Sequence, residues 1–143
     1  MTEVPMAARL RLVVGRLNRR MRAEGGAGLS HLPLSALVSI ERSGPIRLGE
    51  LAAKEGVSAP TMSRALLALD ERGAVERTTD PTDARSVLLT ISPAGRELLA
   101  TVREHYTSSL ARLLSRLDGD QLAAVEAALP ALEALIGEDP PAG

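Results

Sequence analysis

The residues best suited to chemistry lie near the middle of the chain, in the segment SAPTMSR at 58–64. The hydroxyl groups of Ser58, Thr61 and Ser63 can donate hydrogen bonds to phosphates or to the edges of bases. The guanidinium group of Arg64 can form two parallel hydrogen bonds with guanine. Together these side chains suit contact with double-stranded DNA, although any amphipathic helix carries polar residues on its outer face.

A second group of charged residues lies in DPTDAR, at 80–85. Asp80 and Pro81 predict a turn, because aspartate can bond to its own backbone and proline fixes φ. If Asp83 pairs with Arg85, the guanidinium group points outward and can enter a narrow minor groove of DNA, where the negative potential is enhanced. A solvated turn with a local ion pair remains the alternative. A calcium loop is disfavoured, since two carboxylates without a third oxygen ligand bind calcium poorly.

Other kinds of site find little support in the composition. The chain has no cysteine, which excludes disulfides, thiolate metal sites and thiol redox switches. His31 and His105 are the only histidines, and a zinc site would need further ligands close to them. No nucleophile beside a base, glycine-rich phosphate loop or facing pair of carboxylates points to an enzyme. We therefore expect no catalytic residue, no bound metal and no cofactor.

Length and charge set wider limits. The chain has 143 residues and a net charge of −1, and its length favours one compact domain. Residues 1–23 contain six arginines and one glutamate, whereas residues 93–143 contain four basic and eight acidic residues. The total charge argues mildly against DNA binding, although a local basic face can still form. Without an N-terminal signal or an apolar run long enough to cross a membrane, we expect a cytoplasmic protein with no membrane partner.

Hydrophobic periodicity predicts several helices and a pair of strands. Gly56 and Gly73 end two successive short helices, and Ser58 and Pro60 begin the second of them. Residues 80–85 connect the strands, which is longer than a tight hairpin turn. The expected helices are 6–23, 34–42, about 48–55, 58–72, 93–117 and 121–136, and the expected strands are about 74–79 and 86–91.

Two short helices joined by a glycine turn and followed by two strands predict a winged helix-turn-helix within a mainly α fold. In this motif the second helix enters the major groove of DNA, which is about 12 Å wide. That helix must keep one face buried, and the residues expected there are Met62, Ala65, Leu66 and Leu69. Leu67 points largely outward and does not belong to this buried face.

The stretch from Ile46 to Leu98 resembles the MarR family of bacterial transcriptional regulators. Its most specific features are S-x-P-T-x-S-R at the start of the second short helix, DP-x-D-x-R between the strands, and T-x-S-P-A-G before the long helix. The resemblance is close from about residue 30 to residue 99, and the flanking helices match in layout. It implies a homodimeric repressor that binds an inverted-repeat operator in double-stranded DNA and is released by a small aromatic or phenolic effector.

The resemblance also implies roles for individual residues. Arg85 lies in the minor groove and is held by Asp83, while Arg47 is a candidate for a phosphate contact. The residues implied to face the major groove are Ser58, Pro60, Thr61, Ser63 and Arg64. The residues implied near a ligand pocket are His31, Leu34, Val38, His105 and Tyr106.

We expect residues 30–92 to form the DNA-binding region, residues 1–29 and 93–137 a helical dimerisation region, and residues 138–143 a flexible tail. The terminal helices exceed what a DNA-binding domain needs, so their apolar stripes require a partner. Dimer contacts are expected from Leu10, Val14, Leu17, Leu113, Leu117, Leu122, Val125, Leu129 and Leu132. Two alternatives stay open: the terminal helices pack only within one chain, or the winged helix binds another protein and has no operator of its own.

Overall fold

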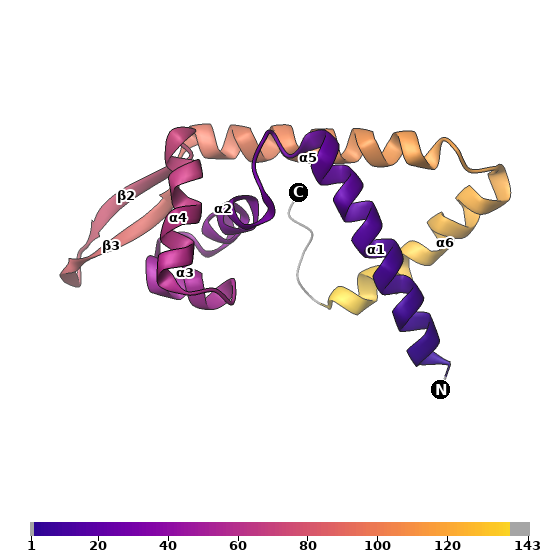
Figure 1. The fold of residues 1–143 in the computed structure, drawn as a ribbon, viewed down its shortest axis with the longest axis horizontal. Coiled ribbons are helices and arrows are strands. Elements are labelled where there is room, and N and C mark those ends of the chain that lie inside the picture. The colour runs from indigo at the N-terminus through magenta and orange to yellow at the C-terminus, as the bar shows by residue number, and fades with distance from the viewer. Residues whose placement is uncertain (1, 138–143) are drawn as a thin grey trace. The chain divides into compact units, whose positions relative to one another are not determined.

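The computed structural model describes residues 2–137 (Figure 1), so the tail expected at 138–143 lies outside the described residues. The chain divides into two compact units, residues 1–109 and residues 110–143. The elements are α1 (Glu3–Gly25), α2 (His31–Ser43), β1 (Ile46–Arg47), α3 (Leu48–Lys54), α4 (Ala59–Glu71), β2 (Val75–Asp80), β3 (Asp83–Ile91), α5 (Pro93–Leu114) and α6 (Gly119–Ile136).

Local signals set the ends of the short helices, as predicted. Ser58 caps α4, because its Oγ accepts a hydrogen bond from the backbone N–H of Thr61 at 3.3 Å. Gly56 follows α3 with φ +67°, and Gly73 follows α4 with φ +62°. Both angles lie in the left-handed region that glycine adopts without steric cost. α2 begins at His31, earlier than expected, since Pro33 is tolerated in the first turn of a helix.

The core of the first unit joins α2, α3, α4 and the sheet. Leu37 and Ile40 of α2, Leu51 of α3 and Met62 of α4 have no solvent exposure. Leu99 of α5 belongs to the same cluster, so the start of α5 is fixed to this core. Each fully buried side chain of this size contributes about 1.5–3 kcal/mol through the hydrophobic effect. This packing holds α4 with one face inward and the other toward solvent.

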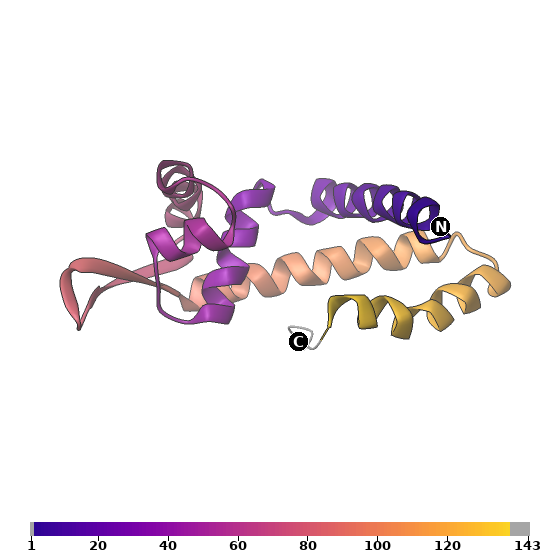
Figure 2. The ribbon, with the colours of Figure 1, turned by 90° about the horizontal axis from the view of Figure 1, so that it is seen from below.

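A three-stranded antiparallel sheet lies beside these helices, with the order β1-β3-β2. The sequence predicted two strands. The third, β1, has only two residues, and Ile46 pairs with Leu89 of β3. The hairpin of β2 and β3, which we call the wing, extends away from the helices (Figures 1 and 2).

The connection within the wing is shorter than expected. Only Pro81 and Thr82 separate β2 from β3, so the prediction of a long connection was wrong. The other residues of the expected connection lie in the strands, where the pairing of β2 with β3 is irregular. Thr79 pairs with Val87 but Asp80 pairs with Asp83, so residues 84–86 lack a partner on β2. A bulge of this kind bends a strand and redirects its side chains.

The wing joins α5 through a close backbone contact. Ser92 caps α5, since its Oγ accepts a hydrogen bond from the backbone N–H of Gly95 at 3.0 Å and donates one to the carbonyl oxygen of Gly73. A β-carbon at position 95 would collide with the carbonyl oxygen of Ala74. The glycine in S-P-A-G is therefore required by the approach of α5 to the start of β2.

The second unit contains the end of α5 and the whole of α6. Asp118 and Gln121 form a capping box at the start of α6: the Gln121 N–H donates to the Asp118 carboxylate at 2.8 Å, and the Asp118 N–H donates to the Gln121 side chain at 3.1 Å. α5 ends at Leu114, three residues earlier than expected. α6 has no buried residue within the single chain. No helix within residues 2–137 is long and apolar enough to cross a membrane.

Candidate nucleic-acid interface

The two faces of α4 separate as predicted. Met62, Leu66 and Leu69 are buried in the core. The opposite face exposes Pro60, Ser63, Arg64 and Leu67, with Thr61 half-buried beside them. The helix therefore presents hydroxyl groups and one guanidinium group to solvent from its first two turns, while its other face is fixed by the core.

Hydrogen bonds order the start of this exposed face. The hydroxyl of Ser58 donates to the hydroxyl of Thr61 at 2.9 Å, and the Nη2 of Arg64 donates to the same Thr61 oxygen at 3.4 Å. Within residues 2–137, Arg64 forms no ion pair. Its positive charge is thus uncompensated and close to the N-terminus of α4, where the helix dipole also favours anions.

Arg85 lies at the bulge of the wing and is exposed. One carboxylate oxygen of Asp83 accepts a hydrogen bond from the backbone N–H of Arg85 at 3.0 Å. The other oxygen accepts a hydrogen bond from the Ser86 hydroxyl at 3.3 Å. Asp83 thus contacts Arg85 through the backbone instead of through the guanidinium ion pair that the sequence suggested. In the part of the chain that the structure describes, the Arg85 side chain forms no ion pair, so it is free to approach a phosphate or a groove.

Asp80 anchors the other side of the wing. It is only 5% exposed and accepts hydrogen bonds from the backbone N–H of Thr82 at 2.9 Å and from the Thr82 hydroxyl at 2.8 Å. Its second carboxylate oxygen accepts a hydrogen bond from Nε of Arg47 at 3.0 Å and another from Nη2 of the same arginine. The backbone bond from Thr82, followed by the bond from Arg47, lowers the pKa of Asp80 to about 2. The sequence predicted the turn bond but not the contact with Arg47.

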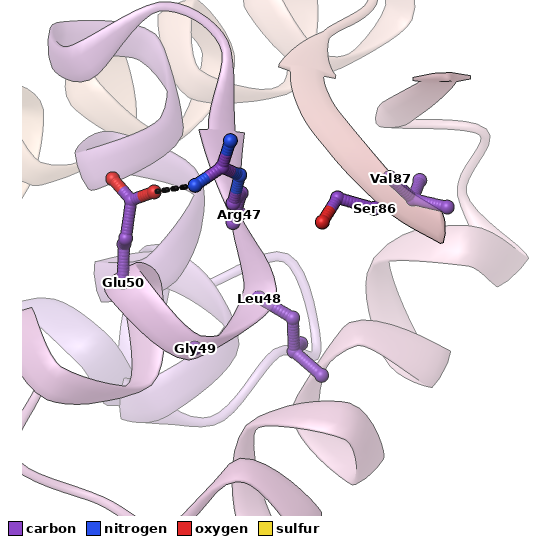
Figure 3. Close-up of a pocket in the computed structure, with 6 residues that line it drawn as sticks. All are labelled: Arg47, Leu48, Gly49, Glu50, Ser86 and Val87. Atoms are coloured by element: carbon purple, nitrogen blue, oxygen red, sulfur yellow. Dashed lines mark ion pairs between the residues drawn. The ribbon is translucent and has the colours of Figure 1, made fainter. Parts of the chain in front are cut away.

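Arg47 therefore connects β1 to the turn end of the wing. It lies on β1, next to β3, and its side chain reaches Asp80 at the end of β2. Glu50 of α3 lies 3.8 Å from the guanidinium group. The dashed line in Figure 3 marks this ion pair. The bond to Asp80 raises the pKa of Arg47. A shallow hollow between the start of α3 and β3 is lined by Arg47, Leu48, Gly49, Glu50, Ser86 and Val87.

A second ion pair, which the sequence did not reveal, connects α4 to the wing. Arg77 of β2 donates two hydrogen bonds to the carboxylate of Asp70, at 2.6 and 3.0 Å. The hydrogen bonds to Asp70 raise the pKa of Arg77. The pair fixes the last turn of α4 against β2 and compensates the negative charge of Asp70 at that end of the helix.

A helix with one exposed polar face, followed by a projecting hairpin with an exposed arginine, is the arrangement of a winged helix-turn-helix. The model of the MarR family matches residues 29–87. An uncharacterised HTH-type transcriptional regulator of Mycobacterium bovis is 32% identical over 140 residues, which are 97% of this chain and 98% of the relative. The chain belongs to the MarR family. It is a helix-turn-helix transcriptional regulator and not an enzyme.

Solved structures of other regulators agree with this MarR-type fold. A transcriptional regulator of Pseudomonas aeruginosa superimposes with a TM-score of 0.79 and 29% identity, over 96% of this chain and 98% of that one. A regulator of Thermotoga maritima gives a TM-score of 0.76 and 26% identity, over 92% and 94% of the two chains. These likenesses extend well beyond residues 29–87.

The residues proposed for a ligand pocket in this MarR-family protein lie in different surroundings. Leu34 is buried, and Val38 packs against the core cluster. Tyr106 is half-buried near Gly25 at the end of α1, and burial raises its pKa. His31 and His105 are exposed. None of the five lines the hollow in Figure 3. Within residues 2–137, no three His, Asp or Glu side chains gather closely enough to hold a metal ion.

The residues proposed for dimerisation are only partly covered within one chain. Four of them are half-buried, namely Leu10, Leu17, Leu113 and Leu117. The others are exposed, namely Val14 at 56%, Leu122 at 44%, Val125 at 38%, Leu129 at 45% and Leu132 at 38%. Leu122, Val125, Leu129 and Leu132 all belong to α6, in which every residue is exposed.

Proposed function

We propose that this protein is a homodimeric repressor in the bacterial cytoplasm that binds an inverted-repeat operator and leaves it when a small molecule binds. The observation that carries this proposal is the pair of uncompensated arginines, Arg64 on α4 and Arg85 on the wing. They project from two neighbouring elements of one core, and within residues 2–137 neither is paired with a carboxylate. Such an arrangement suits the adjacent major and minor grooves of one duplex.

In this proposal α4 is the recognition helix. The major groove, about 12 Å wide, admits a single helix with its N-terminal turns toward the bases. Arg64 donates to guanine, and the hydroxyls of Ser58 and Ser63 contact phosphates or base edges. Thr61 holds Ser58 and Arg64 in place through its own hydroxyl. Pro60 lies in the first turn of α4, where a missing backbone N–H costs little, and it allows the helix to approach the DNA closely.

The wing supplies the second contact. Arg85 enters the minor groove from the bulged segment of β3, while Asp83 fixes the backbone from which it projects. Arg47 holds the turn end of the wing through Asp80, so its main role is structural. Its exposed edge, beside Gly49, also lies where a phosphate could approach the start of α3.

A second copy of the chain is the natural partner for α6 and α1. None of the side chains of α6 is fully buried by its own chain, yet the helix carries a continuous apolar stripe that is still partly exposed. Pairing these stripes gives a symmetric dimer. Such a dimer places two recognition helices for half-sites about 34–36 Å apart, which is one turn of DNA.

The effector is a small aromatic or phenolic compound that binds near the junction of α1, α2 and α5. This part of the proposal rests on the family and on Tyr106, whose half-buried side chain offers a hydroxyl group near Gly25 at the end of α1. Titrating simple phenols and aromatic acids into the protein–DNA complex tests it: loss of DNA binding with wild-type protein, reduced for Tyr106→Phe, is the expected result.

The central experiment is selection of duplexes from a random DNA pool with the purified protein, together with sedimentation analysis. We expect a dimer and an enriched inverted repeat, whose affinity falls steeply with salt because bound counterions are released. Enrichment of no sequence, at any ionic strength, would instead favour a winged helix that binds another protein. The exposed Leu67 keeps that second candidate open.

A further inference from the structure

Leu67 is an apolar side chain in an unusual place. It lies on α4 and is 60% exposed, although Met62 and Leu69 on the core-facing side of the same helix are completely buried. It follows Ser63 by four residues and Arg64 by three, and residues so spaced are neighbours on one helix face. Leu67 therefore continues the row of side chains proposed to face DNA, about one turn further along the helix.

The composition of this face limits how it can recognise bases. α4 contains no asparagine and no glutamine, the side chains that form paired hydrogen bonds with adenine. Its only forked donor is Arg64, which suits guanine. An adenine–thymine pair also carries the C5-methyl group of thymine in the major groove, and an apolar side chain recognises that group by contact. Leu67 is the largest exposed apolar side chain on α4.

The charges beyond Leu67 mark where the contact ends. Asp70 and Glu71 follow within the next turn and are exposed. Asp70 is compensated by Arg77, but an exposed carboxylate at Glu71 repels phosphates. The recognition helix must therefore leave the groove just after Leu67, which makes this leucine the last side chain of the face able to touch a base.

We propose that Leu67 is a specificity-determining residue that contacts the C5-methyl group of a thymine in each half-site. This inference rests on the proposed role of α4 as the recognition helix. Leu67 lies about 4.5 Å along the helix axis from Arg64, at 1.5 Å per residue. The thymine is therefore about one or two base steps from the guanine that Arg64 contacts, since bases rise about 3.4 Å per step.

The test replaces each thymine of the selected operator, one at a time, with deoxyuridine, which lacks only the methyl group. For wild-type protein we expect one thymine per half-site at which the replacement weakens binding about fourfold, the effect of one buried methyl group. For Leu67→Ala the same replacement should have no effect. Leu67→Met, which retains an apolar side chain, should restore sensitivity to the replacement.

Arg64→Ala separates this contact from general loss of binding. That variant should bind the operator less tightly yet keep the fourfold sensitivity to deoxyuridine at the thymine. If Leu67→Ala keeps the wild-type sensitivity, or if no thymine is sensitive in the wild type, the assignment of Leu67 is overturned while operator binding stands. Unchanged DNA binding by Leu67→Ala in every respect would indicate that this leucine faces a protein partner. If selection enriches no sequence, both the assignment and the proposed function fail.

Discussion

At the scale of single residues, Asp80 stabilises the wing through two kinds of contact, one within its own turn and one with a distant residue. Its turn bond to Thr82 follows from its position before Pro81, and the sequence indicates this bond. Its contact with Arg47 spans 33 residues, and no local pattern relates the two positions. The same holds for Asp70 and Arg77, whose pairing depends on how α4 meets β2. Contacts that tertiary packing creates are the part of this interface that sequence patterns did not reveal.

The low pKa of Asp80 leads to a prediction about acid stability. Its pKa is about 2 in the folded protein, below the value of about 3.9 of an unfolded chain. The stabilisation is therefore complete above about pH 4 and is lost as the pH falls toward about 2. Thermal unfolding of Asp80→Asn against pH should show the largest deficit near neutrality and a narrowing deficit below about pH 4. A deficit that stays constant down to about pH 2 would contradict this.

Arg64 is the residue whose loss should change base preference. Arg64→Ala should weaken binding to the selected operator by about 1–3 kcal/mol and relax the preference at one base step. Fluorescence anisotropy on operators with single substitutions measures both effects. Arg116→Ala, which removes an equal charge from an exposed residue after α5, is the matched control. If Arg64→Ala has the same base preference as the wild type, Arg64 does not contact a base.

The contribution of Arg85 to DNA affinity should depend on the shape of the DNA and not on its base edges. Arg85→Ala should weaken binding chiefly on operators whose flanks are A-tracts, because their narrow minor groove has an enhanced negative potential. Affinities measured for operators with A-tract and with mixed flanks give the comparison. Equal losses on both kinds of flank would assign Arg85 to an ordinary phosphate contact.

At the scale of elements, predictions succeeded where the signals are local. The cap Ser58 and the glycines after α3 and α4 mark helix ends by short-range chemistry, so these boundaries were predictable. β1 was missed because two residues carry no periodic pattern, and their pairing with β3 is set by the core. The sequence predicted residues 80–85 as a connection, whereas residues 84 and 85 lie in the bulged part of β3. This part of the strand was missed because bulged residues lack regular alternation.

The contact between α5 and β2 predicts contrasting effects of two glycine substitutions. Gly95→Ala should lower the free energy of unfolding by about 1–3 kcal/mol, since the new methyl group overpacks a site against the Ala74 carbonyl. Gly49→Ala in α3 meets no atom within 4 Å and should raise stability by up to about 1 kcal/mol through helix propensity. Denaturant unfolding of both variants makes the comparison. Equal stability of the two would exclude a steric role for Gly95.

At the scale of the whole molecule, the net charge was a poor guide. A total of −1 spread over 143 residues argued mildly against a DNA-binding protein, yet the chain belongs to the MarR family. The total conceals the pairing: Arg47 and Arg77 are compensated by carboxylates, whereas Arg64 and Arg85 form no ion pair within residues 2–137. Local placement of charge, which needs the fold, decides which surface attracts phosphates.

Dimerisation gives the last prediction, because the proposed binding to an inverted-repeat operator requires two copies of the chain. Val125 lies within the apolar stripe of α6, and Ala127 lies on the opposite face, since successive helical residues are about 100° apart. Val125→Lys buries a charge if the stripes pair, so it should yield a monomer with weakened operator binding. Ala127→Lys adds the same charge outside the stripe and should remain dimeric. Analytical ultracentrifugation distinguishes the two. A dimeric Val125→Lys variant with wild-type affinity would show that α6 does not hold the copies together.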